Sequence, residues 1–157
     1  STYSVLIATY IKDCPEKLQR ALESILENDF KLDEIVLVCD GPITSSQERL
    51  IDIFSDKAKS QSIIFKKISL EKNKGLPSAL NEGLKNTSAD WVFRMDSDDI
   101  CTPTRFSDQI KFQQETKADI IGGRIAEFEG QYTKSNCSLE RKIPIGKIKL
   151  GMKSILR

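Results

Sequence analysis

The feature that most constrains the fold is a regular alternation between short apolar segments and longer segments with helical periodicity. The apolar segments are rich in β-branched and aromatic residues and cover residues 3–8, 34–39, 62–68 and 89–95. Between them, apolar residues recur every three or four positions, as in Leu18, Leu22 and Ile25. Because buried strands that alternate with amphipathic helices are typical of parallel sheets, the sequence predicts an α/β fold: a mainly parallel sheet with helices on both faces.

Turn and capping residues locate the helices between these strands. Pro15 suits the first turn of a helix that continues to Leu26, and Thr44 is a candidate N-cap for the next helix. Leu76, Leu80 and Leu84 indicate a third helix. We expect a fourth helix to start at Pro103 and to carry Phe106 and Ile110.

The pattern weakens in the last part of the chain. A fifth strand is expected over residues 119–125. Residues 131–142 are polar and predict a loop, and residues 144–157 predict one short helix with no further strand. Residues 1–157 are expected to form a single domain, since 157 residues suit one core of ordinary size.

Composition excludes several classes of function. The chain has no histidine, which rules out Ser-His-Asp triads, Cys-His proteases and histidine-ligated zinc. The net charge is +1, so binding of nucleic acid through bulk charge is not expected. Chemistry in this chain must therefore depend on carboxylates, hydroxyls, amines, thiols or a metal ion held by oxygen.

The four cysteines indicate a reducing compartment. They are Cys14, Cys39, Cys101 and Cys137. They form no Cys-x-x-Cys pair, and no signal peptide or apolar run of about 18 residues is visible. We expect reduced thiols and a cytoplasmic location, with Cys39 and Cys101 as packing residues.

The acidic segment Asp96-Ser97-Asp98-Asp99 follows the fourth strand. Two carboxylates separated by one residue can lie on the same side of extended backbone, where hard cations such as Mg²⁺ or Mn²⁺ bind together with phosphate oxygens. An ordinary Asp-rich turn is an equally good interpretation of this segment alone. A calcium loop of the EF-hand type is excluded, because its sixth and twelfth positions would be Cys101 and Ser107.

Other polar residues follow the remaining strands, where ligands bind in sheets of this kind. Tyr10 could stack on a planar base, or it could be a partly buried aromatic residue. Asp40 could accept hydrogen bonds from a base or ribose, or it could form an Asp-Gly turn with Gly41.

The segment Lys72-Asn73-Lys74-Gly75 precedes the third helix. Its backbone amides and two lysines could receive phosphate, although a solvated basic turn is the alternative. The Walker and Gly-x-Gly-x-x-Gly motifs are absent.

Taken together, these blocks resemble the family-2 glycosyltransferases of the GT-A fold. The blocks are residues 5–10, residues 35–41, Asn73-Lys74-Gly75 with Ala79, Asn81 and Gly83, and Asp96-Ser97-Asp98-Asp99 with Pro103 and Arg105. Their order and spacing agree with the family up to about Gly123.

The resemblance implies a nucleotide-sugar donor, most often a UDP-sugar, and a Mn²⁺ or Mg²⁺ ion. It implies that Tyr10 lies against the base and that Asp40 accepts a hydrogen bond from the base ring. The implied donor-binding residues are Thr9, Tyr10, Asp40, Asn73, Gly75, Asp96 and Ser97, and the implied metal ligands are Asp96 and Asp98.

The resemblance does not extend to a catalytic base. The carboxylates after Asp119 are Glu127, Glu129 and Glu140, and none matches the family's acidic pair. We therefore expect a donor-binding domain that is truncated before its acceptor-binding part. The expected acceptor is a saccharide or a lipid-linked sugar in polysaccharide biosynthesis, with the protein in the cytoplasm or at the inner face of the membrane.

Two alternatives stay open. A sugar-nucleotide nucleotidyltransferase has a related core, but it would require a Gly-rich, Arg-bearing loop after the first strand, and residues 8–12 lack one. A nucleotide-binding module without catalytic activity would leave the acidic segment as a capping turn.

Overall fold

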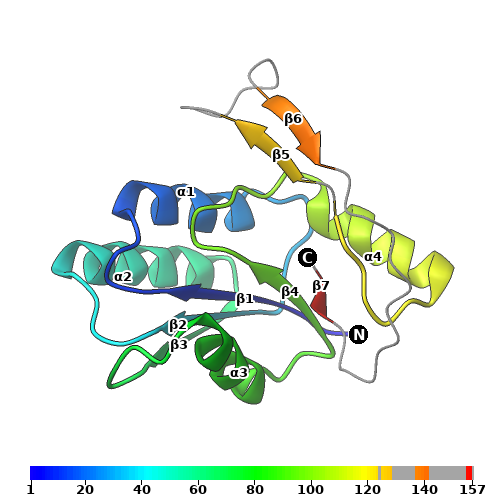
Figure 1. Cartoon of the computed structure of the whole chain (residues 1–157). Coiled ribbons are helices and arrows are strands. Elements are labelled where there is room, and N and C mark those ends of the chain that lie inside the picture. The colour runs from blue at the N-terminus through cyan, green and yellow to red at the C-terminus, as the bar shows by residue number, and fades with distance from the viewer. Residues whose placement is uncertain (124, 129–136, 142–154, 157) are drawn as a thin grey trace.

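The computed structural model describes residues 1–123, 125–128, 137–141 and 155–156, and Figure 1 shows a parallel sheet between layers of helices. The strands of this sheet are β1 (Tyr3–Thr9), β2 (Glu34–Cys39), β3 (Ile64–Ser69), β4 (Trp91–Met95) and β7 (Ile155–Leu156). Their order in space is β3-β2-β1-β4-β7, and every pairing is parallel. The predicted α/β fold with a parallel sheet is confirmed.

Helices cover both faces of the sheet, as predicted (Figure 1). They are α1 (Pro15–Leu26), α2 (Ser45–Ser60), α3 (Leu76–Asn86) and α4 (Arg105–Thr116). Apolar residues of α1, α2 and α4 pack in one core with alternate residues of the strands, such as Ile7 and Leu37. The intervening strand residues, such as Leu6 and Val38, pack against α3 on the other face. Complete burial of β1 and β2 explains why these strands are continuous apolar runs.

Local sequence signals account for the starts of α1 and α2. Pro15 occupies the first turn of α1, and Thr44 caps α2 through a capping box with Gln47. The helix α4 begins at Arg105, with Thr104 as its N-cap. Pro103 therefore precedes this helix and does not start it.

Gly83 allows α3 to lie close to the sheet. A Cβ atom at this position would be 2.2 Å from Cδ1 of Leu6 and 3.0 Å from Cγ2 of Val38. The absence of a side chain therefore sets how near the helix approaches β1 and β2.

The predicted start of the fifth strand at Asp119 is wrong. Ile121 is buried in the core, but the residues from Asp119 to Gly123 form no strand. Gly122 and Gly123 have no side chains with which to stabilise an extended segment. The strand β5 (Ile125–Phe128) begins later and pairs antiparallel with β6 (Cys137–Arg141) in a separate two-stranded sheet.

The structure also corrects the expectations for the C-terminal part of the chain. Residues 137–141 belong to β6 and not to a loop, while 131–136 and 142 lie outside the described residues. Residues 155–156 form β7 beside β4, although no further strand was expected there. The remainder of the helix expected over 144–157 lies outside the described residues.

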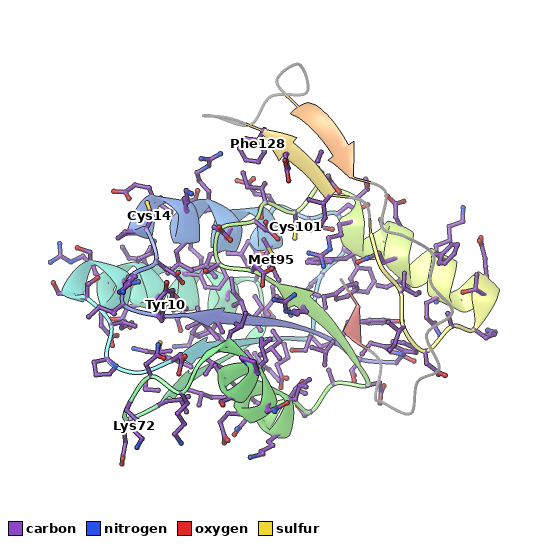
Figure 2. The ribbon with its side chains drawn as sticks, viewed as in Figure 1. Tyr10, Cys14, Lys72, Met95, Cys101 and Phe128 are labelled. Atoms are coloured by element: carbon purple, nitrogen blue, oxygen red, sulfur yellow. The ribbon has the colours of Figure 1, made fainter. Side chains whose placement is uncertain are left out.

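The cysteines whose side chains are described are free thiols. Cys39 and Cys101 are buried, as expected for packing residues, and burial raises the pKa of both thiols. The sulfur of Cys101 lies 3.2 Å from that of Met95 inside the molecule (Figure 2). Within the described residues, no helix combines the length and the apolar composition needed to cross a bilayer.

Candidate functional site

The topology creates a cavity at the carboxyl ends of the strands. The chain passes from β1 outward to β2 and β3, and then crosses back to place β4 on the other side of β1. Ligands bind at such a reversal because the loops that leave neighbouring strands diverge there. A pocket of about 380 Å³ lies at this position and is lined by Ala8, Thr9, Tyr10, Asp13, Asp40, Asn73, Gly75, Leu76, Asp96, Ser97 and Asp98.

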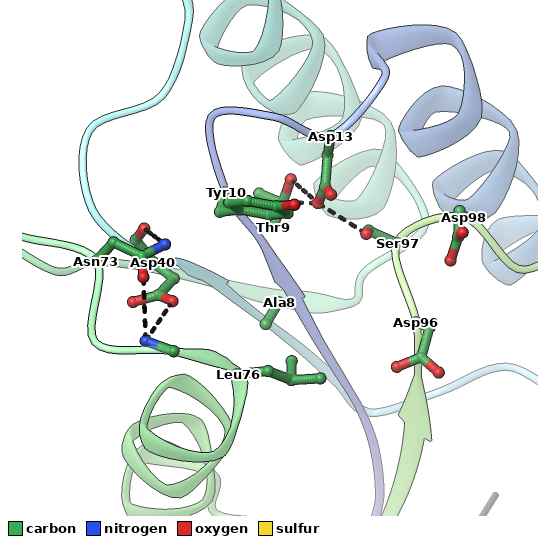
Figure 3. Close-up of a pocket in the computed structure, with 11 residues that line it drawn as sticks. Ala8, Thr9, Tyr10, Asp13, Asp40, Asn73, Leu76, Asp96, Ser97 and Asp98 are labelled. Atoms are coloured by element: carbon green, nitrogen blue, oxygen red, sulfur yellow. Dashed lines mark hydrogen bonds between the residues drawn. The ribbon is translucent and has the colours of Figure 1, made fainter.

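Every residue that the sequence analysis assigned to the donor or the metal lines this one pocket. Figure 3 shows Asp40 and Asn73 on one side, Asp96 and Asp98 on the other, and Thr9 and Tyr10 between them. The resemblance therefore named residues that are far apart in the sequence and close together in space.

Asp40 holds the loop before α3. Its side chain is buried, and its two carboxylate oxygens accept hydrogen bonds from the backbone amides of Lys74 (2.7 Å) and Gly75 (2.9 Å). The side-chain amide of Asn73 donates to the backbone carbonyl of Asp40 at 3.3 Å. These contacts fix the loop against the end of β2.

The same contacts bear on the segment before α3, whose amides and lysines could receive phosphate or form a solvated basic turn. Two of these amides, those of Lys74 and Gly75, donate to Asp40. The side chains of Lys72 and Lys74 are not among the groups that line the pocket. Lys72 lies at the outer end of its loop (Figure 2).

Tyr10 and Asp13 lie on the loop that follows β1. Tyr10 is 38% exposed and lines the pocket, so its aromatic side chain is available to a planar ligand. The buried side chain of Gln47 in α2 donates to the backbone carbonyls of Tyr10 (2.8 Å) and Asp13 (3.2 Å). The loop is thereby anchored to α2.

Residues 96–99, which we call the acidic loop, follow β4. Arg94 forms an ion pair with Asp96. Arg105 of α4 donates to the backbone carbonyl of Arg94 at 2.9 Å. Partial burial, together with repulsion from Asp96 and Asp98, raises the pKa of Asp99. The three carboxylates of the loop therefore carry more negative charge than the two neighbouring guanidinium groups, those of Arg94 and Arg105, neutralise.

The donor atoms of the acidic loop fit a hard divalent cation. In the part of the chain that the structure describes, no three or more His, Cys, Asp or Glu side chains gather as a metal-binding group. Asp96 and Asp98 both line the pocket, and two carboxylates are sufficient where phosphate oxygens and water complete the coordination of Mg²⁺ or Mn²⁺. The unbalanced negative charge of the loop favours a cation in the same position.

Sequence reasoning missed three residues that shape this site: Asp13, Gln47 and Arg94. The capping box of Thr44 and Gln47 was partly visible as a candidate N-cap, but the bonds from Gln47 to residues 10 and 13 were not. The partner of Asp13 is Ser97, which is 84 positions away in the sequence. Arg94 was assigned only to a strand.

The mainly parallel sheet, its helices and its strand order are those of the GT-A fold. The chain belongs to glycosyl transferase family 2, whose family model matches residues 4–155.

Several known proteins are similar to this chain. An uncharacterized glycosyltransferase of Haemophilus influenzae is 45% identical over 80% of this chain and 46% of its own length. The UDP-Gal:alpha-D-GlcNAc-diphosphoundecaprenol beta-1,3-galactosyltransferase of Escherichia coli is 36% identical over 90% of this chain and 50% of its own. The crystal structure of S. aureus TarS 1–349 in complex with UDP has a TM-score of 0.67 and 26% identity, and covers 86% of this chain and 39% of that one. This chain thus spans about half the length of these curated relatives.

Proposed function

We propose that the pocket binds the nucleotide of a UDP-sugar and that the protein transfers the sugar to an acceptor hydroxyl. The observation that carries the proposal is the convergence of Tyr10, Asp40, Asp96 and Asp98 from three strand ends on one pocket of about 380 Å³. Family membership, the UDP complex of TarS and the name of the E. coli relative support this choice of donor.

The base side of the pocket, formed by Tyr10, Asp40 and Asn73, would receive the uracil. The exposed ring of Tyr10 offers a stacking surface. A carboxylate has about four lone-pair positions, and two backbone amides occupy only part of this capacity in Asp40. Asp40 can therefore accept one more hydrogen bond, from the ring N–H of the base.

The acidic loop would lie at the diphosphate. We propose that Asp96 and Asp98 hold Mn²⁺ or Mg²⁺ there, with Asp96 also near the ribose. A bound divalent cation supplies positive charge to the diphosphate as it leaves. Arg94 pairs with Asp96 and so limits the orientations that this carboxylate can adopt.

We further propose that residues 1–157 form a single donor-binding domain and that the acceptor site depends on sequence outside this chain. The relatives are about twice as long as the part that they share with it. The E. coli relative is named for a lipid-linked acceptor, and we propose an acceptor of the saccharide or lipid-linked class, used at the inner face of a membrane.

Thermal unfolding in the presence of UDP tests the proposal. A ligand at one hundred times its dissociation constant stabilises the native state by about 2.7 kcal/mol, which corresponds to roughly 5–10 °C in Tm for a chain of this size. We expect such a shift with UDP plus Mn²⁺ and a smaller one with UDP plus EDTA.

Two variants serve as controls for this measurement. Asp98→Ala should remove the contribution of Mn²⁺. Asp56→Ala should behave as the parent, because its side chain is 84% exposed on α2. The absence of any Tm shift with UDP, with or without metal, would reject the proposed donor.

A further inference from the structure

Asp13 connects two loops that leave different strands. One oxygen of its carboxylate, Oδ2, accepts hydrogen bonds from the hydroxyl of Thr9 (2.9 Å), the backbone amide of Tyr10 (3.2 Å) and the hydroxyl of Ser97 (2.7 Å). Thr9 and Tyr10 belong to the end of β1, whereas Ser97 belongs to the acidic loop after β4. Figure 3 shows these bonds converging on Asp13 at the wall of the pocket.

The position of Asp13 is fixed from behind. Its backbone amide donates to the carbonyl of Tyr10 at 3.0 Å, and Gln47 donates to the carbonyls of both residues. Gln47 is fully buried, and its side-chain oxygen accepts from the backbone amide of Thr44 at the N-cap of α2 (2.9 Å). The backbone of Asp13 is therefore anchored to α2 through Gln47.

The link to Ser97 acts at the centre of the acidic loop. Ser97 lies between Asp96 and Asp98, the two carboxylates proposed to hold the metal. A change in the backbone at Ser97 would move both carboxylates relative to the base side of the pocket. The bond is short, and its acceptor is a carboxylate; charge-assisted bonds of this kind are roughly twice as strong as neutral ones.

We propose that Asp13 is a positioning residue that sets the acidic loop at the correct distance from the base side, through its bond to Ser97. The inference rests on the proposed function, because it assumes that one nucleotide spans the base side and the metal. Its consequence is energetic coupling: Asp13 strengthens the part of nucleotide binding that depends on metal. Three donors around Oδ2 also spread its negative charge, so that Asp13 can lie in the wall of a pocket for a diphosphate.

The test is the dissociation constant of UDP, measured by isothermal titration calorimetry in Mn²⁺ and again in EDTA. The ratio of the two constants reports the metal-dependent part of binding. Asp13→Ala should weaken UDP binding about tenfold in Mn²⁺ and by less than about threefold in EDTA. Asp13→Asn retains a carbonyl oxygen as acceptor and should restore most of the lost affinity.

Ser97→Ala removes the link and leaves the bonds of Asp13 to Thr9 and Tyr10 in place. It should raise the Mn²⁺-to-EDTA ratio of the dissociation constants as Asp13→Ala does, and the double variant should show no further rise. This variant also keeps the proposal testable if Asp13→Ala does not fold. Ser60→Ala is the matched control, because it removes a hydroxyl that donates to a backbone carbonyl (Lys57, 2.7 Å) outside the pocket, and its ratio should equal that of the parent.

The outcomes separate the inference from the proposed function. A parent chain that binds no UDP in either condition overturns the proposed function and the inference with it. A parent chain that binds UDP with a metal-dependent affinity, while Ser97→Ala and Asp13→Ala leave the ratio unchanged, overturns the inference alone. Additive losses in the double variant would likewise show that Asp13 does not act through Ser97.

Discussion

Single residues determine how closely the loops around the pocket approach each other, and Gly41 shows this most clearly. Its φ angle is +89°, a value that side chains rarely permit. A Cβ atom on Gly41 would lie 2.6 Å from the backbone nitrogen of Asn73. Glycine at this position therefore lets the end of β2 contact the loop before α3.

The substitution Gly41→Ala should destabilise the fold more than Gly75→Ala. Both residues have positive φ, so both substitutions carry strain of about 1–3 kcal/mol. Only the substitution at Gly41 also causes a clash with the backbone, since a Cβ at Gly75 would meet nothing closer than 3.9 Å. Urea denaturation of the two variants measures the difference, and equal losses would contradict the importance of the close approach.

A second prediction at this scale concerns Asp40. Asp40→Ala removes the acceptor of two loop amides and the proposed contact with the base, so UDP binding should weaken by about 1–3 kcal/mol. Calorimetric titration with UDP measures this loss. An unchanged dissociation constant would reject the role of Asp40 at the base.

Among the elements, β2 is tied to its neighbours at the end of the sheet opposite the pocket. The buried carboxylate of Glu34 forms an ion pair with Lys66 of β3 at 2.6 Å. It also accepts bonds from the hydroxyls of Thr87 (2.6 Å) and Ser88 (2.7 Å), which connect α3 to β4. Burial alone would raise the pKa of Glu34, but these donors outweigh burial and lower it.

This cluster predicts how stability depends on pH. Because the pKa of Glu34 is lower in the folded state, its stabilising contribution is complete above the unfolded value near 4.5 and is lost as the pH falls through the folded value. Glu34→Gln should therefore cost about 1–3 kcal/mol at pH 7 and less at pH 3.5. Urea denaturation of the parent and of Glu34→Gln at pH 7 and at pH 3.5 measures the difference in their free energies of unfolding. A difference that does not change with pH would contradict the prediction.

The elements also show which signals in the sequence are local. The sequence predicted the strands β1 to β4 and the helices that follow the first three of them. It could do so because an apolar run or a helical period is a property of each segment alone. The segment 119–123 looked similar, yet only Ile121 is buried and no strand forms. Strand formation there depends on partners elsewhere in the chain, and a local apolar pattern does not specify them.

At the scale of the whole molecule, the strand order β3-β2-β1-β4-β7 brings the site together. The residues of the pocket were predictable as the polar groups that follow strands and from the family resemblance. Their contacts were not, because the bond between Asp13 and Ser97 exists only when β1 and β4 are neighbours. The hydrogen bonds from the amides of Lys74 and Gly75 have the same origin, since Asp40 reaches them from the end of β2.

The whole chain should bind donor and transfer sugar poorly. This expectation follows from the proposal that the acceptor site depends on sequence outside these 157 residues. The measurement compares UDP binding with the release of UDP from UDP-sugars in the presence and absence of saccharide acceptors. Efficient acceptor-dependent release by this chain would contradict the proposed division.

The central claim is that the nucleotide binds where the loops after β1, β2 and β4 meet. Titration of UDP and Mn²⁺ into the ¹⁵N-labelled chain tests it directly by NMR, because each perturbed amide is located in the sequence. The proposed site predicts perturbations in residues 8–13, 40–41, 72–76 and 96–99. Perturbations centred on Glu34 and Ser88 at the opposite end of the sheet, with the pocket amides unchanged, would contradict it.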